Sequence, residues 1–185
     1  MVDPARILNT GRFDLEKAMT SPAWNSEPRF ERQSETDEYG VSSFVYRARR
    51  PFHPERFWKF LQANGLKNVL RSKGVVWIAG RGEFAGVWSQ AGHNCQLDPA
   101  GYWYAVLPKE EWPDDPADRA MIEAVWQAGV GDRRQELVMI GIGIDPNHLT
   151  AALDSCLLTN EEMRLGDAGW ATFRDPLPAW NLPLN

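Results

Sequence analysis

The chain has 185 residues, of which 43% are hydrophobic and 24% are charged. These proportions are typical of one folded domain with its own hydrophobic core. The formal net charge of -5 argues against broad electrostatic binding to nucleic acid or to an anionic membrane, because both need a concentrated positive surface. The apolar runs are far shorter than the roughly 20 residues of a membrane helix, and no signal-peptide pattern is present, so we expect a cytoplasmic protein.

Residues 2–38 are polar and contain proline, and they end in a charged run, which is typical of a linker. Within them, residues 13–19 could form two helical turns that need a surface to dock on. Regular structure is expected to begin with a strand at residues 41–48. A helix should follow at residues 54–64, because it opens on proline, spaces its apolar residues helically and stops at Gly65.

Three β-like segments come next, at residues 69–79, 86–91 and 102–107. The glycine-containing groups 80–82 and 98–101 separate them and are predicted to be turns. Connections this short favour an antiparallel meander.

The second half of the chain begins with an acidic loop and returns to alternating elements. The expected elements are a loop at 110–118, a helix at 117–127, a buried strand at 134–144, a helix at 146–156 and a short helix at 159–164 that starts with a capping box. The resulting order, β-α-β-β-β-α-β-α, predicts an α+β fold: a mainly antiparallel sheet of four to five strands with helices packed on one face. A ferredoxin-like arrangement is one possibility.

Six stretches of the chain resemble, in the same order, sequences of the CobW C-terminal domain family. They are residues 39–46 (YGVSSFVY), 49–56 (RRPFHPER), 69–74 (VLRSKG), 87–92 (VWSQAG), 131–138 (GDRRQELV) and 153–159 (LDSCLLT). The resemblance implies that residues 39–185 form a CobW C-terminal-like domain. It also implies that residues 1–38 hold the end of a GTPase domain and a linker, since residues 7–14 look like the end of the family's GTPase half.

Members of that family couple GTP hydrolysis to metal delivery, and some relatives are associated with cobalamin synthesis or nitrile hydratase activation. The resemblance therefore implies GTP, magnesium and zinc or cobalt for a full-length parent. This chain has no Gly-rich run followed by Gly-Lys-Ser or Gly-Lys-Thr, and it lacks the Cys-x-Cys-Cys motif of the GTPase half. We expect no cofactor site and no enzyme activity in this chain by itself.

Two charged groups are candidate partner-binding sites. Arginine binds carboxylates and phosphates bidentately, so these groups could contact an acidic partner or the nucleotide-bound GTPase domain. The alternative for the first group is a solvated face. The alternative for the second is a network of charges that fixes the start of a strand. The groups are Arg49, Arg50, His53 and Arg56, and then Asp132, Arg133 and Arg134.

His93 and Cys95 are candidate metal ligands, because an imidazole and a thiol two residues apart can bind one soft divalent ion. Two ligands are too few for a complete site, and a buried or unligated role is the simpler interpretation. Trp77, Trp88 and Trp103 lie on predicted strands; core packing is the default, and exposure of several on one sheet face would indicate a protein-binding surface.

The leading functional hypothesis is an interaction and regulatory module of a GTP-dependent zinc or cobalt chaperone. It would bind a metalloprotein client or sense the nucleotide state of the attached GTPase domain. The alternative is a domain that carries metal directly through His and Cys ligands. Neither a membrane nor nucleic acid is expected as a partner.

Overall fold

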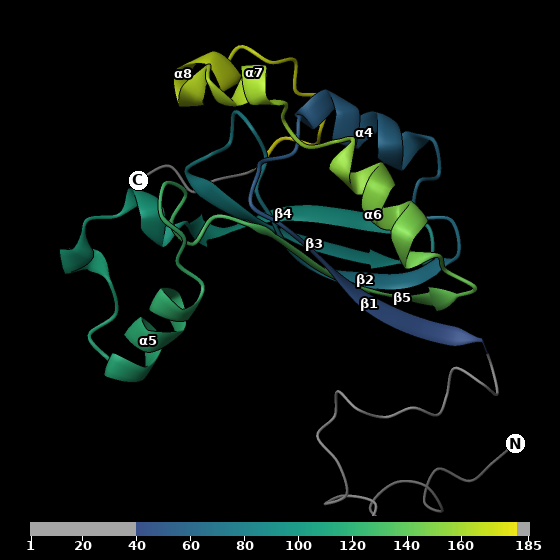
Figure 1. The fold of residues 1–185 in the computed structure, drawn as a ribbon, viewed down its shortest axis with the longest axis horizontal. Coiled ribbons are helices and arrows are strands. Elements are labelled where there is room, and N and C mark those ends of the chain that lie inside the picture. The colour runs from purple at the N-terminus through teal and green to yellow at the C-terminus, as the bar shows by residue number, and fades with distance from the viewer. Residues whose placement is uncertain (1–39, 181–185) are drawn as a thin grey trace, which may run out of the picture. The chain divides into compact units, whose positions relative to one another are not determined.

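The computed structural model describes residues 40–180 (Figure 1). A five-stranded sheet in the order β1-β5-β2-β3-β4 forms the centre of the domain, and every neighbouring pair is antiparallel. The strands are β1 (Val41–Ala48), β2 (Val69–Val76), β3 (Phe84–Ala91), β4 (Asn94–Tyr102) and β5 (Gln135–Ile142). The predicted α+β fold is confirmed.

The strand order contains a split β-α-β unit. Strands β1 and β2 both run antiparallel to β5, so they are parallel to each other with β5 between them. Helix α4 (Pro54–Gln62) makes the crossover from one to the other. Gly74 on β2 makes the pairing with β5 possible, because a Cβ at this position would overlap the Glu136 carbonyl.

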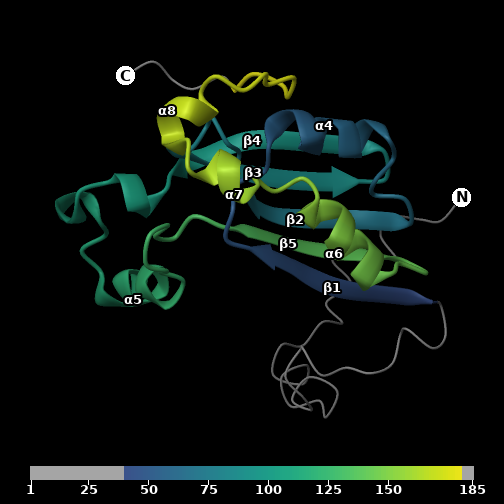
Figure 2. The same ribbon diagram turned by 45° about the horizontal axis from the view of Figure 1, so that its top comes forward.

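Four helices cover one face of the sheet, and no helix within residues 40–180 covers the other, which we call the open face (Figures 1 and 2). They are α4, α6 (Pro146–Asp154), α7 (Asn160–Met163) and α8 (Gly166–Trp170). Helix α5 (Pro116–Ala124) and the 3₁₀ turns η2 (Tyr104–Val106) and η3 (Lys109–Glu111) instead extend from one end of the sheet. We call residues 104–130, which contain these three elements, the α5 arm.

The core lies between the sheet and the four covering helices. Its main cluster joins the sheet to α4 and α6 through large buried side chains such as Tyr46, Phe57 and Leu153. A second cluster gathers three tryptophans, Trp77, Trp103 and Trp170, of which Trp77 is 1% exposed. Together with Trp88, at 2%, the strand tryptophans are core residues and do not form an exposed aromatic face.

One sequence prediction was wrong at the end of the meander. Residues 98–101 do not form a turn; they belong to β4, which ends at Tyr102, and residues 103–107 leave the sheet through η2. The pairing jumps from Gly86↔Pro99 to Ala85↔Gly101, so one residue of β4 is extra. Proline is accommodated because β4 is an edge strand with an irregularity at this point, where a missing N–H disrupts no second neighbour.

The bounds of the remaining predicted elements agree closely with the observed ones, and α8 was not predicted. The strand predicted to be buried, β5, is exposed on one of its two sides, because no described helix covers that face of the sheet. The helix expected at residues 13–19 and the linker lie outside the described residues. Within residues 40–180, no helix is long and apolar enough to cross a membrane.

Candidate interaction surface

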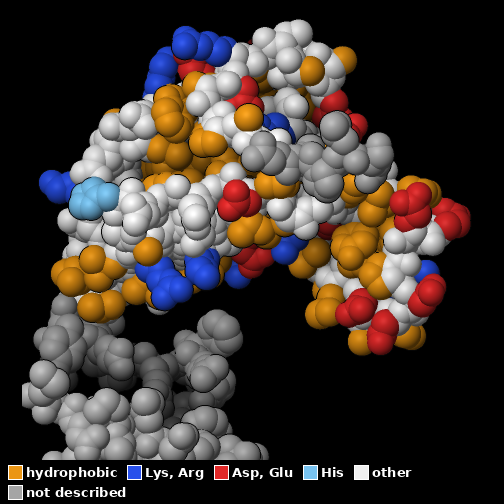
Figure 3. All heavy atoms as spheres, turned by 180° about the vertical axis from the view of Figure 1, so that it is seen from behind, with side chains coloured by type: hydrophobic (Ala, Val, Ile, Leu, Met, Phe, Trp, Pro, Cys, Tyr) orange, Lys and Arg blue, Asp and Glu red, His pale blue; other side chains and the backbone are white. Residues whose placement is uncertain are grey.

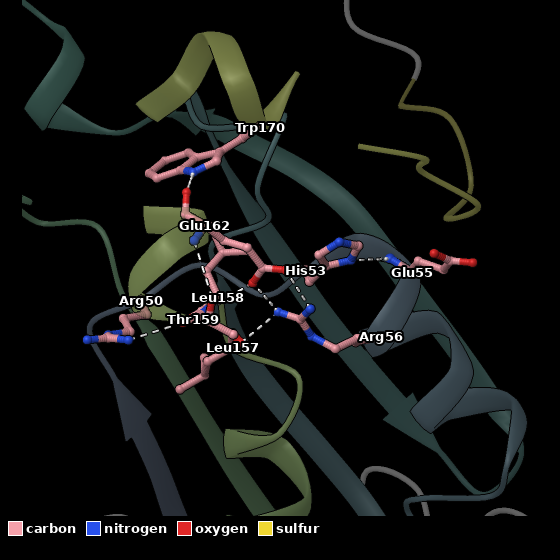
Figure 4. A network of polar contacts seen from close by, with 9 residues as sticks. All are labelled: Arg50, His53, Glu55, Arg56, Leu157, Leu158, Thr159, Glu162 and Trp170. Carbon is pink, nitrogen blue, oxygen red and sulfur yellow. Dashed lines mark hydrogen bonds and ion pairs between the residues drawn. The ribbon is translucent and has the colours of Figure 1, made fainter. Parts of the chain in front are cut away.

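The predicted basic residues near α4 bind groups of the chain itself. Arg56 donates to both carboxylate oxygens of Glu162 at 2.8 and 2.6 Å and to the Leu157 carbonyl at 2.9 Å (Figure 4). The Arg56 guanidinium is the main reason that the pKa of Glu162 falls from 4.5 to about 2. This bidentate pair ties α4 to α7.

His53 and Arg50 lie in the same network (Figure 4). His53 caps α4, with Nδ1 accepting from the Glu55 amide at 3.2 Å, and its ring stacks on Phe173. Burial, followed by the Arg56 cation, lowers the pKa of His53. Arg50 donates to the Leu158 carbonyl and to Asn160 Oδ1.

A reciprocal cap completes this region at the start of α7. The Thr159 hydroxyl accepts from the Glu162 amide, and the Glu162 carboxylate accepts from the Thr159 amide, as the predicted capping box requires. We call Arg50, His53, Arg56, Thr159 and Glu162 the α4–α7 joint. Its charged side chains bind other groups of the domain.

The second predicted group surrounds the entrance to β5. Arg49 donates to three backbone carbonyls, the shortest bond being 2.7 Å to Val125. Asp132 accepts from the Tyr104 and Ala105 amides at 3.1 and 2.8 Å, which holds the start of η2. These two side chains therefore attach the α5 arm to the sheet.

Arg133 and Arg134 are also engaged within the chain. Arg133 donates to the Val130 carbonyl at 3.1 Å, and its guanidinium lies 5.1 Å from the centre of a Trp77 ring. Arg134 donates to Glu136 at 2.8 Å, and this hydrogen bond is the main cause of the lowered pKa of Glu136.

His93 and Cys95 lie at the hairpin between β3 and β4, and both are exposed. Partial burial raises the pKa of Cys95, which disfavours the thiolate that metal binding requires. Within residues 40–180, no three His, Cys, Asp or Glu side chains are grouped to hold one metal ion. The structure does not supply the ligands that the pair lacks.

The open face of the sheet carries exposed aliphatic side chains. On β5, Gln135, Leu137 and Met139 point to the core, whereas Val138, Ile140 and Ile142 are 43%, 38% and 50% exposed. Val45 of β1 pairs with Val138 and extends this apolar row sideways.

Positive charges lie beside that row. On β2, Arg71 pairs with Ile140 and Lys73 pairs with Val138, so both cations share the open face with the aliphatic side chains. Arg71 and Lys73 are exposed, and Figure 3 shows Lys and Arg side chains next to hydrophobic ones on this side of the sheet. The open face therefore combines an apolar row with a cationic row.

A sequence model of the cobalamin synthesis protein cobW C-terminal domain matches residues 41–157, which is most of the described sheet and helix layer. The chain belongs to the CobW C-terminal domain family. In this CobW C-terminal domain, the matched region runs from β1 to the end of α6 and the first residues after it.

Related proteins are longer than this chain. The domain is 42% identical over 174 residues to the zinc-regulated GTPase metalloprotein activator 1 of Dictyostelium discoideum, which covers 92% of this chain and 36% of that protein. It is 29% identical over 142 residues to the zinc chaperone Rv0106 of Mycobacterium tuberculosis, covering 76% and 35%. The zinc-bound YjiA GTPase from E. coli aligns in structure over 75% of this chain and 36% of its own, with 17% identity and a TM-score of 0.47. This CobW domain thus spans about a third of its curated relatives' length.

The residues of this CobW domain do not fit GTP, magnesium, zinc or cobalt, the groups that the family implies. The sequence has no phosphate-binding Gly-Lys-Ser or Gly-Lys-Thr run, and residues 40–180 bring no set of metal ligands together. The main candidate site of this CobW domain is therefore the open face of its sheet. The sequence did not predict the open face, because β5 has apolar residues on both of its sides. That pattern is also typical of a strand that is covered on both faces.

Proposed function

We propose that this domain is the interaction module of a GTP-dependent zinc chaperone, and that the open face binds the GTPase domain or a metalloprotein client. The observation that carries the proposal is the exposed row of Val138, Ile140 and Ile142 on an uncovered sheet. Family membership supports this role, because one relative is named a zinc chaperone and another a zinc-regulated GTPase metalloprotein activator.

Contiguous exposed apolar side chains are a feature of binding surfaces in soluble proteins. Covering the open face would remove three half-exposed aliphatic side chains from water, each contributing roughly 1 kcal/mol. Arg71 and Lys73 beside them would favour a partner with a carboxylate rim and would set its orientation. The proposal places docking here rather than on Arg49, Arg50 or Arg56, which already bind carbonyls and carboxylates of the domain.

The proposal is tested with the GTPase part of the Dictyostelium relative, prepared without its own C-terminal third. Calorimetry measures its affinity for this domain in the GDP state and with a non-hydrolysable GTP analogue. A difference of tenfold or more would identify a nucleotide sensor. Equal binding in both states would favour a docking role without sensing.

Two matched variants assign the surface. Ile140→Asp on the open face should weaken binding at least tenfold, whereas Leu165→Asp, which alters an apolar side chain that is 54% exposed and precedes α8, should leave it unchanged. Equal effects of the two variants would contradict the proposal, and absence of binding in both nucleotide states would exclude the GTPase domain as the partner and leave the metalloprotein client. Stoichiometric zinc binding by the isolated domain, lost in Cys95→Ser, would support a metal carrier instead.

A further inference from the structure

The α5 arm encloses an apolar cavity that the proposed function does not use. Its volume is about 640 Å³, which is in the range of small-ligand and side-chain pockets. Its lining is Tyr104, Pro113, Asp118, Met121, Ile122, Ala124, Val125, Asp132 and Arg134. Ile122 is buried, whereas Met121 is 64% exposed.

The cavity walls are held in place by local bonds. Asp132 anchors the start of η2, and Asp115 caps α5 through the Ala117 amide at 2.7 Å. Arg119 of α5 donates to the Pro113 carbonyl at 2.6 Å, which fixes the loop to the helix. Arg134 pairs with Glu136, which also pairs with Arg47, so the positive charge at the cavity lies at the end away from Asp118 of α5.

The arm around the cavity is strongly acidic. Residues 109–123 contain six carboxylates and two cations. The carboxylates belong to Glu110, Glu111, Asp114, Asp115, Asp118 and Glu123, and all six residues are exposed. Figure 3 shows the arm as a hydrophobic patch with Asp and Glu side chains around it.

A second, smaller cavity of about 200 Å³ lies beside the first, toward the sheet. The two share Ala124, Val125 and Arg134, and the second is also lined by Arg47, Arg49 and Glu136. The second cavity is lined by three arginines and one carboxylate, so the acidic rim belongs to the groove under α5 alone.

We propose that this groove binds a segment of a partner protein that presents a large apolar side chain flanked by Lys or Arg. The inference rests on the proposed role as an interaction module only for the choice of a protein partner. The apolar side chain would occupy the cavity beside Met121 and Ile122, and the flanking cations would face Asp118 and its neighbours. Nucleic acid and anionic membranes do not match this chemistry, because the acidic rim repels them.

The test uses two synthetic nonapeptides with a central Phe, one flanked by Lys and the other by Glu. The domain is labelled with ¹³C at its methionine methyl groups. The Lys peptide should shift the Met121 signal, while Met139, which is 0% exposed on β5, stays unchanged. We expect the Glu peptide to bind at least tenfold more weakly, and raising the salt from 50 to 300 mM to weaken the Lys peptide several-fold.

Charge variants localise the contact. Asp118→Lys should lower the affinity for the Lys peptide about fivefold or more, and Asp98→Lys, the same change on the exposed β4 edge, should not. Asp118→Asn provides a milder change if the Lys variant unfolds. Equal binding of both peptides, an unmoved Met121 signal, or equal effects of the Asp118 and Asp98 variants would overturn the proposal. Ile140→Asp leaves this assay unaffected, so failure of the open-face proposal is separately visible.

Discussion

The α4–α7 joint and the α5 arm are both rich in charge, yet they use it in opposite ways. In the joint, Arg56 and Glu162 form a bidentate pair, and Arg50 donates to a carbonyl and an amide oxygen (Figure 4). In the arm, Asp118 and Glu123 face solvent around an apolar cavity.

The difference teaches that a run of charges in the sequence does not by itself indicate a partner. The cations at residues 49–56 follow a strand that ends against the helix layer, where unpaired carbonyls and carboxylates are within reach. The carboxylates at residues 110–123 belong to a segment that extends from one end of the sheet, and the six of them outnumber its two cations, Lys109 and Arg119. Four predictions test this difference between the joint and the arm.

The largest effect is expected at the attachment of the arm. Gly131 has φ +69°, and a Cβ there would overlap the Ala105 methyl, so Gly131→Ala should destabilise the domain by about 3 kcal/mol. Gly129→Ala is the control, because Gly129 also has a positive φ, of +87°, but has open space around it. Its cost should be about 1 kcal/mol. Urea unfolding measures both, and equal costs would show that the close approach to Ala105 is not needed.

The joint should lose stability when its cation is removed. Arg56→Ala leaves Glu162 without its bidentate partner and is expected to cost about 2 kcal/mol. Arg47→Ala removes a pair with Glu136 in which the arginine side chain is 66% exposed, and should cost less than about 0.5 kcal/mol. If chemical denaturation gives the same loss for both, the joint is an ordinary surface pair.

The joint should also confer a pH dependence. The pKa of Glu162 is about 2 in the folded domain and 4.5 ordinarily, so its contribution is full above pH 4.5 and is lost as the pH falls toward 2. After allowance for solvent screening, the loss is about 1 kcal/mol. Glu162→Gln should remove that part of the pH dependence when urea midpoints at pH 6 and pH 3 are compared. If the urea midpoint of the Glu162→Gln variant falls between pH 6 and pH 3 as much as that of the unmodified domain, this assignment to Glu162 is contradicted.

The smallest effect is expected in the arm. Met121→Gln replaces an exposed side chain at the cavity mouth and should change the free energy of unfolding by less than about 0.5 kcal/mol. The same variant should still weaken the Lys peptide. A stability loss comparable to that of Arg56→Ala would mean that the cavity wall belongs to the core.

Local signals predicted most of the fold. The proline-led helix at Pro54, the capping box at Thr159 and the position of β5 were all found, because each depends on neighbours in sequence. The prediction that β5 is buried was wrong for one of its two sides. The segment 98–107 was predicted wrongly, since Pro99 and Gly101 are tolerated only because β4 is an edge strand.

The surfaces depended on long-range contacts. Whether Arg50 and Arg56 are free or bound is decided by residues 157–162, about a hundred positions away. No local pattern reports such a partner, so the predicted partner-binding residues could be placed only by the structure.

By itself, the sequence determined the α+β class, the order of the elements and the family. Periodicity decides which residues share one side of a strand or helix. Only the tertiary structure decided which side of the sheet is covered, and thus that Val138, Ile140 and Ile142 are exposed beside Arg71 and Lys73. The physical reason is that exposure depends on where α4, α6, α7 and α8 pack, and all four pack on the same face.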